Sequence, residues 1–208
     1  MGEVVLNQHG QKMGRKGLVT RRRIMDKTLD LLKNSSYKDL TVAEVAYEAG
    51  VSSSSFYVYF SDIEDVLFAC VENAAQDMSS IMELVEEEWP PENLRRQVAR
   101  FVESYLKLWE RHQVELRVRN LEADQGNRRF YDFRIKSTEG LIVALSQKFS
   151  IAHPGFKNNM GLATVFITSI ERIAAAHMIG FSGKVKLTRK KLSDALVDTL
   201  YLMISGEL

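Results

Sequence analysis

The chain has 208 residues, of which 45% are hydrophobic and 26% are charged, a balance typical of a soluble globular protein with one large or two small domains. This composition excludes a disordered tail. A single cysteine, Cys70, excludes an intramolecular disulfide, so the core must form by packing alone, as it does in reduced cytosolic proteins. The 3 prolines and 12 glycines are too few for the many tight turns of an all-β sandwich, so we expect an all-α fold.

The hydrophobic pattern indicates neither secretion nor a membrane span. No positively charged stretch followed by an apolar core and a cleavage site opens the sequence, as a signal peptide would require. In the most apolar region, residues 160–181, the longest uncharged run covers residues 158–170, which is shorter than the roughly 20 residues of a membrane span. We therefore expect a cytoplasmic protein without membrane contact, in which this region forms a buried helix.

Charge is separated along the chain, although the formal net charge is only +1. Residues 1–23 contain six basic side chains and one acidic side chain, whereas residues 61–92 contain ten acidic side chains and no lysine or arginine. The first block predicts a basic arm, over residues 12–23, that seeks anions such as phosphates. The acidic block should avoid them.

The first three predicted helices follow from caps and a turn. Helical periodicity begins after Thr20, which can serve as an N-cap. A second helix begins at Thr41, which forms a capping box with Glu44 three residues later. Gly50 then stands where a sharp turn needs a positive φ, and Ser52 can cap a short third helix. The predicted arrangement is helix, tight glycine turn, helix.

The second part of the chain is predicted to contain six longer helices. The first covers residues 63–88 and ends before Trp89-Pro90-Pro91, because proline cannot continue a helix. Polar breaks near His112 and at residues 124–127 separate the next two, and an apolar stripe ending at Phe149 marks another. The last pair is expected at residues 158–180 and 188–205, on either side of residues 182–184. About nine helices are expected in total.

Residues 40–60 combine these elements into a helix-turn-helix pattern. In its second helix, Phe56 and Phe60 lie four residues apart and can anchor inward, whereas the serines and tyrosines around them remain available on the outer side. Hydroxyl groups at the positive N-terminus of a helix suit phosphates and base edges. Serine lacks the paired donors of arginine or asparagine, so we expect modest direct readout of the bases.

This pattern resembles the DNA-binding region of the tetracycline-repressor (TetR) family of transcriptional regulators. The resemblance covers residues 24–60 and continues into residues 64–67. In that family a threonine opens the second helix, Ala-Gly-Val-Ser forms the turn and Phe-Tyr-x-x-Phe closes the recognition helix; here these are Thr41, residues 49–52 and residues 56–60. Ile63 departs from the family pattern, because many members have a phosphate-contacting lysine there.

The resemblance implies two domains. Residues 1–62 would form a three-helix, helix-turn-helix DNA-binding domain with a basic N-terminal arm, and residues 63–208 an effector-binding and dimerisation domain. It also implies phosphate contacts by Thr41, Tyr57 and Tyr59, with the serine run facing the major groove. The candidate DNA-binding residues are Arg22, Arg23, Thr41, Ser52, Ser53, Ser54, Ser55, Tyr57 and Tyr59.

The last two predicted helices are apolar on more than one face, which one chain cannot easily cover. The expected second cover is an identical subunit, which would form an intermolecular four-helix bundle as the family resemblance implies. Such a homodimer would place two recognition helices about 34 Å apart on a near-palindromic operator.

Aromatic residues are dense between the prolines and Phe149. In the TetR family the corresponding helices hold an apolar effector, so the resemblance implies a ligand pocket in this region. The alternative for each residue is core packing without a cavity. The candidate lining residues are Phe101, Tyr105, Trp109 and Phe133, with Phe166 opposite.

The expected function is therefore a one-component regulator, acting as a repressor that a small, largely apolar effector releases from DNA. A helical small-molecule-binding protein with weak or lost DNA binding is the alternative. Enzyme activity has little support, because the four histidines show no metal-ligand spacing with one another or with Cys70, and no phosphate-binding glycine loop occurs. We expect no catalytic residue, no metal and no cofactor.

Overall fold

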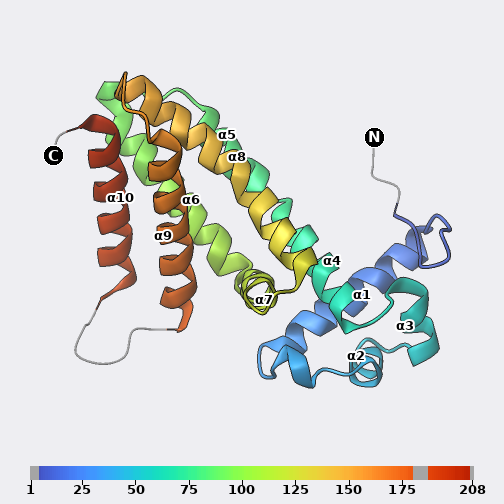
Figure 1. The fold of residues 1–208 in the computed structure, drawn as a ribbon. Helices are drawn as coiled ribbons and strands as arrows, with labels where there is room; N and C mark the ends of the chain where they lie inside the picture. The colour runs from blue at the N-terminus through green and yellow to red at the C-terminus, as the bar shows by residue number, and fades with distance from the viewer. Residues whose placement is uncertain (1–4, 180–186, 207–208) are drawn as a thin grey trace. The chain divides into compact units, whose positions relative to one another are not determined.

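The computed structural model describes residues 5–179 and 187–206, and within these ranges it contains ten α-helices and two short 3-10 helices (Figure 1). The prediction of an all-α fold is confirmed. None of the described helices is long and apolar enough to cross a lipid bilayer. The elements are α1 Arg15–Leu32, η1 Tyr37–Asp39, α2 Val42–Glu48, α3 Ser53–Tyr59, α4 Ile63–Ala75, α5 Met78–Glu86, η2 Pro91–Asn93, α6 Leu94–Arg111, α7 Gln113–Asp124, α8 Arg128–Ala152, α9 Asn159–Ile179 and α10 Arg189–Ser205.

These helices form two compact units. Unit 1 contains the described residues of Met1–Ala74 and Val114–Gln125, and unit 2 contains those of Ala75–Gln113 and Gly126–Leu208. This division differs from the predicted boundary after residue 62, because α4 packs into the core of unit 1 through Val66, Ala69 and Cys70. The chain also returns to unit 1 with α7, and the Tyr37 hydroxyl donates a hydrogen bond of 3.0 Å to Gln125, the residue that follows this helix.

The helix-turn-helix of unit 1 forms at the predicted residues. The Thr41 hydroxyl accepts a hydrogen bond from the amide of Glu44 at 3.2 Å and caps α2. Gly50 has a φ of 62°, which is the left-handed conformation that the turn requires. The Ser52 hydroxyl then caps α3 by accepting from the amide of Ser55 at 3.1 Å. Behind the turn lies a core of fully buried apolar side chains, which includes Ile24, Val45, Phe56 and Phe60.

The first helix begins earlier than predicted. It starts at Arg15 with Gly14 as its N-cap, and Thr20 lies inside it, where its hydroxyl donates to the carbonyl of Lys16. A threonine can form this bond within a helix as well as cap one, so the residue type alone did not locate the start. The prediction of a basic arm is therefore wrong for residues 15–23, which are helical because arginine and lysine are good helix formers.

The predicted helix over residues 63–88 is also wrong, because the structure divides it into α4 and α5. At the break, the Asp77 carboxylate lies 2.9 Å from Nη1 of Arg111 and 2.9 Å from Nε2 of His112. These two partners, at the C-terminal end of α6, are far from Asp77 in sequence, and no glycine or proline marks the site. Within the described ranges, this division gives ten α-helices where about nine were predicted.

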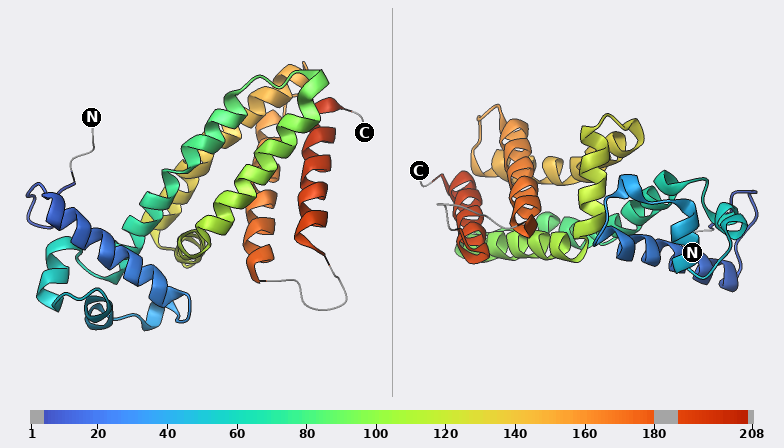
Figure 2. Two further views of the ribbon diagram at one scale, coloured as in Figure 1. Left: turned by 180° about the vertical axis from the view of Figure 1, so that it is seen from behind. Right: turned by 90° about the horizontal axis from the view of Figure 1, so that it is seen from below.

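Unit 2 is a bundle of long helices. The predicted breaks of the chain at His112, at residues 124–127 and after α8 are confirmed. The helix α8 packs along both α9 and α5, and α10 packs along α6 (Figures 1 and 2). A Cβ atom at Gly140 of α8 would lie 3.4 Å from the Met82 side chain of α5, so these two helices approach closely there.

The last two helices occupy the predicted ranges up to Ile179 and from Arg189; the predicted connection at residues 182–184 lies outside the described residues.

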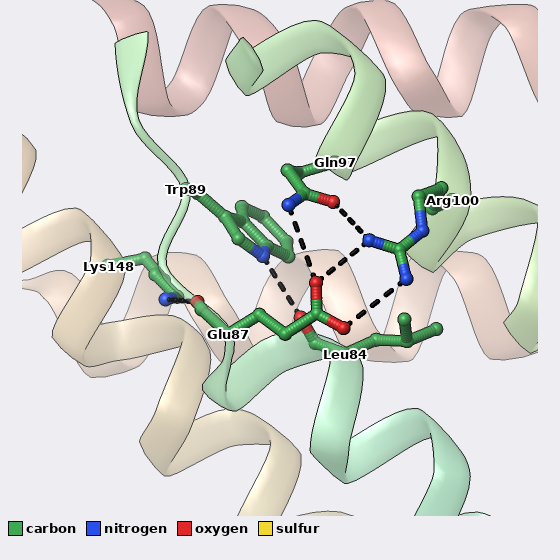
Figure 3. Close-up of polar contacts among 6 residues, drawn as sticks. All are labelled: Leu84, Glu87, Trp89, Gln97, Arg100 and Lys148. Carbon is green, nitrogen blue, oxygen red and sulfur yellow. Dashed lines mark hydrogen bonds and ion pairs between the residues drawn. The ribbon is translucent and has the colours of Figure 1, made fainter.

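Polar contacts close the connection between α5 and α6 where the prolines interrupt the helices (Figure 3). Arg100 donates to both carboxylate oxygens of Glu87, at 2.8 and 3.3 Å, and this hydrogen bonding lowers the pKa of Glu87. The Trp89 indole donates to the carbonyl of Leu84 at 3.0 Å. Lys148 of α8 donates to the Glu87 carbonyl and lies 5.3 Å from the centroid of the Trp89 ring. The connection is thereby tied to α8 as well as to α6.

Candidate nucleic-acid interface

The short helix α3 has a buried side and an exposed side. Phe56 and, at the C-cap, Phe60 are almost completely buried, with their ring centroids 5.8 Å apart, as predicted. Ser53, Ser54 and Tyr57 are exposed, and half of the Tyr57 side chain is accessible to solvent. The helix can therefore present hydroxyl groups outward while its phenyl rings hold it to the core.

The structure separates the four predicted serines into two pairs. The Ser52 hydroxyl caps α3 and lies 3.0 Å from the Ser55 hydroxyl, so both groups already have hydrogen-bond partners within the turn. Ser53 and Ser54 lie exposed in the first helical turn, where the helix N-terminus favours negatively charged groups. Ser53 and Ser54 are thus better placed for a nucleic-acid contact than the capping pair.

The two predicted tyrosines differ in the same way. Tyr59 is half-buried and packs against the core of unit 1, whereas Tyr57 points into solvent. Thr41 is exposed at the start of α2, with its hydroxyl engaged in capping.

Tyr47, at the other end of α2, is 80% exposed and was not among the predicted residues.

The predicted arginines lie on α1 rather than on an extended arm. Both side chains are exposed, and Arg22 donates to Asp26 at 3.1 Å and to Asn73 of α4 at 3.2 Å. Both side chains line a shallow groove along α1. Arg21, which was not predicted as a site residue, lies over the Phe60 ring at 4.9 Å from its centroid and braces the core.

Residues 5–13 form a hairpin-like turn that the sequence analysis did not predict; we call it the N-terminal hairpin. Leu6 and Lys12 form an antiparallel bridge, and the amide of Gly10 donates to the carbonyl of Asn7. From this turn Gln8 contacts both the end of α3 and the start of α4. An asparagine followed three residues later by glycine is typical of such a turn and was the available signal.

The predicted effector-binding residues all lie in unit 2. Phe101, Tyr105 and Trp109 of α6 and Phe166 of α9 are buried, whereas Phe133 of α8 is half-buried. The Phe101 ring lies 6.2 Å from that of Tyr105, and the Trp89 ring is 6.1 Å from Phe101 on the other side. Ring contacts thus link Trp89, Phe101 and Tyr105, and the role of the five predicted residues in binding a ligand stays a prediction. No group of three histidine, cysteine or acidic residues in the described part of the chain could hold a metal ion.

Two family models match most of the chain. The model described as bacterial regulatory proteins of the tetR family matches residues 24–70. The model described as the tetracyclin repressor-like C-terminal domain matches residues 81–207, which is more than half of the chain. The chain belongs to the TetR family. This TetR-family protein is therefore a transcriptional regulator, with the helix-turn-helix in unit 1.

Solved structures agree with this assignment of the fold. A tetR-family transcriptional regulator from Streptomyces coelicolor has a TM-score of 0.70 and 19% identity, over 93% of this TetR-family chain and 84% of that one. The transcriptional regulator FadR from Bacillus subtilis, in complex with stearoyl-CoA, has a TM-score of 0.66 and 18% identity, over 90% and 99%. FadR from Bacillus halodurans, a fatty acid degradation regulator, has a TM-score of 0.64 and 16% identity, over 95% and 98%. A comparison with curated proteins found no match.

Proposed function

We propose that this protein is a repressor that binds a near-palindromic operator as a homodimer and leaves it when a small, largely apolar effector binds unit 2. The observation that carries the proposal is the two-sided helix α3, which buries Phe56 and exposes Ser53, Ser54 and Tyr57. A soluble helical carrier would have no need for exposed hydroxyl groups at the N-terminus of a helix that follows a glycine turn. Such groups suit phosphates and base edges in the major groove.

The individual contacts divide between positioning and readout. Thr41, Tyr57 and Tyr59 bind phosphates. Of the two tyrosines, Tyr57 is the more accessible to solvent. Ser53 and Ser54 face base edges, whereas Ser52 and Ser55 act mainly by capping the helix. Arg23, with Arg22 beside it, adds contacts to flanking phosphates from α1. Phosphate contacts carry no sequence information, so specificity rests on the two exposed serines and on the shape of the operator.

The homodimer forms through α9 and α10. Met160 and Val165 of α9 are 50% and 63% exposed, and Ala195 and Thr199 form an exposed strip of small side chains on α10. Exposed apolar and small residues on adjacent helices support pairing with a second copy around a two-fold axis. The symmetric pair then presents two copies of α3 to successive turns of the duplex, about 34 Å apart.

The effector binds among the aromatic side chains of unit 2, with Phe101, Tyr105, Trp109, Phe133 and Phe166 as its lining. The FadR structure from Bacillus subtilis contains stearoyl-CoA, which supports an effector with a long acyl chain. An effector that prefers a conformer with misaligned recognition helices lowers operator affinity by the ratio of its two affinities. A tenfold reduction requires a difference of about 1.4 kcal/mol.

The DNA-binding part is tested by selecting duplexes from a randomised pool with the purified protein and measuring their affinity at two salt concentrations. We expect a near-palindromic consensus and a steep loss of affinity with salt, because phosphate contacts release counterions. Tyr57→Ala should weaken all duplexes by about three- to tenfold, and equally, since a phosphate contact does not read sequence. Tyr47→Ala, which removes an exposed tyrosine outside the proposed contacts, serves as the control and should change affinity less. Failure to select any duplex would favour the small-molecule-binding alternative.

The effector part is tested with stearoyl-CoA, with coenzyme A alone as the control. Stearoyl-CoA should raise the melting temperature of the protein and release the selected duplex, because a ligand that binds the folded state stabilises it by mass action. Coenzyme A alone should do neither. An equal response to both compounds would contradict an effector recognised through its apolar chain.

A further inference from the structure

We propose that the N-terminal hairpin positions the recognition helix α3 for DNA and that Gln8 is its positioning residue. This inference rests on the proposed DNA binding and adds to it a part of the chain that lies outside the helix-turn-helix. The hairpin precedes the region that the family model matches, which begins at residue 24.

The N-terminal hairpin is held in shape by hydrogen bonds among its own residues. The Asn7 side-chain oxygen accepts from the amides of His9 at 3.0 Å and Gln11 at 2.9 Å. The amide of Gly10 donates to the Asn7 carbonyl at 2.9 Å, and Gly10 adopts the left-handed conformation with a φ of 72°. An asparagine at the first position of a turn and a glycine at its fourth are the residues that this geometry favours. These local bonds hold Gln8 at the corner of the turn.

The backbone of Gln8 caps α3. Its amide donates to the carbonyl of Val58 at 3.0 Å. Val58 lies in the last turn of a seven-residue helix, where the carbonyl groups have no partner within the helix itself. A short helix with few internal hydrogen bonds depends strongly on such external ones. Gln8 thus donates a hydrogen bond to a carbonyl group that has no partner within the recognition helix.

The side chain of Gln8 fixes the loop that follows. Its amide nitrogen donates to the carboxylate of Asp65 at 2.9 Å, and the same carboxylate oxygen accepts from the amide of Ser61 at 3.1 Å. Ser61 belongs to the connection between α3 and α4, and Asp65 lies in the first turn of α4. Gln8 therefore joins the end of α3 to the start of α4 through its backbone amide and its side chain.

The hairpin is also anchored to α1. Met13 is buried, at 8% exposure. A Cβ atom at Gly17 of α1 would lie 3.5 Å from the Cβ atom of Met13. The hairpin thus connects three helices of unit 1 while its bonds from Gln8 lie near the surface. Since such bonds contribute little to global stability, their loss should affect the orientation of α3 more than the fold.

The test compares Gln8→Ala and Gln8→Pro with Gln147→Ala, which removes an exposed glutamine of α8. Gln8→Ala removes the side-chain bond, and Gln8→Pro also removes the amide donor, at a turn position where proline is favoured. The measurements are affinity for a duplex selected by the wild-type protein and affinity for an unrelated duplex. We expect Gln8→Ala to weaken the selected duplex by about three- to tenfold and Gln8→Pro by more, with the unrelated duplex changed less than about twofold. Gln147→Ala should change neither.

The ratio of the two affinities distinguishes positioning from a general loss of stability. Partial unfolding would lower both affinities equally and leave the ratio unchanged, and that result would overturn the proposal. An unchanged affinity in both Gln8 variants would also overturn it. A wild-type protein that selects no duplex contradicts the proposed function itself, and this outcome is seen before any variant is made.

A second comparison tests whether Gln8 acts through Asp65. In a background that carries Asp65→Ala, the further change Gln8→Ala should have almost no effect on the selected duplex, because the bond is already lost. A full additional loss in that background would mean that Gln8 contacts DNA directly, which would contradict its role as a positioning residue.

Discussion

The two units of the molecule reach stable helices by different means. In unit 1, α2 and α3 have only seven residues each, and their ends are defined by hydroxyl caps and a glycine turn. In unit 2, α8 has 25 residues and its stability comes from packing along neighbouring helices. Isolated helices of seven residues are unstable in water, so the surface proposed to read DNA depends on its caps and on a small core behind it. The bundle depends on large buried aromatic side chains instead.

Removing one fully buried phenyl ring from each core is the strongest way to test this difference. Phe56→Ala in unit 1 and Phe149→Ala in unit 2 should each lower the free energy of unfolding by about 3–5 kcal/mol, because each leaves a cavity. Urea unfolding followed by circular dichroism measures this loss. Phe56→Ala should abolish binding to the selected duplex while the native mass stays that of the dimer. A loss of dimer in Phe56→Ala would contradict the separation of roles between the units.

A charge on α9 should disrupt dimerisation with a smaller loss of stability than the two phenylalanine substitutions cause. Val165→Glu places a carboxylate on the proposed dimer face, where two copies would bring like charges together. We expect a monomer by native mass and affinity for the selected duplex reduced by about 100-fold, since two half-sites no longer bind together. Ile135→Glu changes an exposed residue of α8 and is the matched control, expected to remain dimeric. A dimeric Val165→Glu protein would place the interface elsewhere.

The smallest effect is expected at the break between α4 and α5. Hydrogen bonds from His112 and then Arg111 lower the pKa of Asp77 below its usual 3.8. A lowered pKa means that this carboxylate stabilises the folded state above pH 3.8, and that the contribution is lost as the pH falls through the lower, folded-state pKa. Because Asp77 is partly exposed, the contribution should be below about 1 kcal/mol.

Melting temperatures measured as a function of pH test this last prediction. Asp77→Asn should melt below the wild-type protein at neutral pH, and the two curves should converge as the pH falls below 3.8. Glu92→Gln, which neutralises an exposed carboxylate in η2, should follow the wild-type curve throughout. A constant difference between Asp77→Asn and the wild-type protein at every pH would show that the carboxylate charge is not involved.

Much of the candidate interface could be predicted because its signals are local. Thr41 and Ser52 each cap a helix by accepting from the amide three residues later, and Gly50 marks the turn between these helices. Phe56 and Phe60 lie four residues apart and are both buried. The start of α1 could not be located, because Thr20 forms a bond inside the helix that resembles a cap in sequence. The different exposure of Tyr57 and Tyr59 also depends on what packs against the helix, which residue type does not reveal.

The sequence by itself determined the all-α class, the helix-turn-helix and the places where most helices end, since these depend on bonds between residues three or four positions apart. Only the tertiary structure decided where α4 gives way to α5, that α7 belongs with unit 1, and that the N-terminal hairpin reaches the end of α3. The contact of Asp77 with His112 joins residues 35 positions apart, and that of Gln8 with Asp65 joins residues 57 apart. Such pairs become neighbours only through the packing of the whole unit, so no pattern in consecutive residues indicates them.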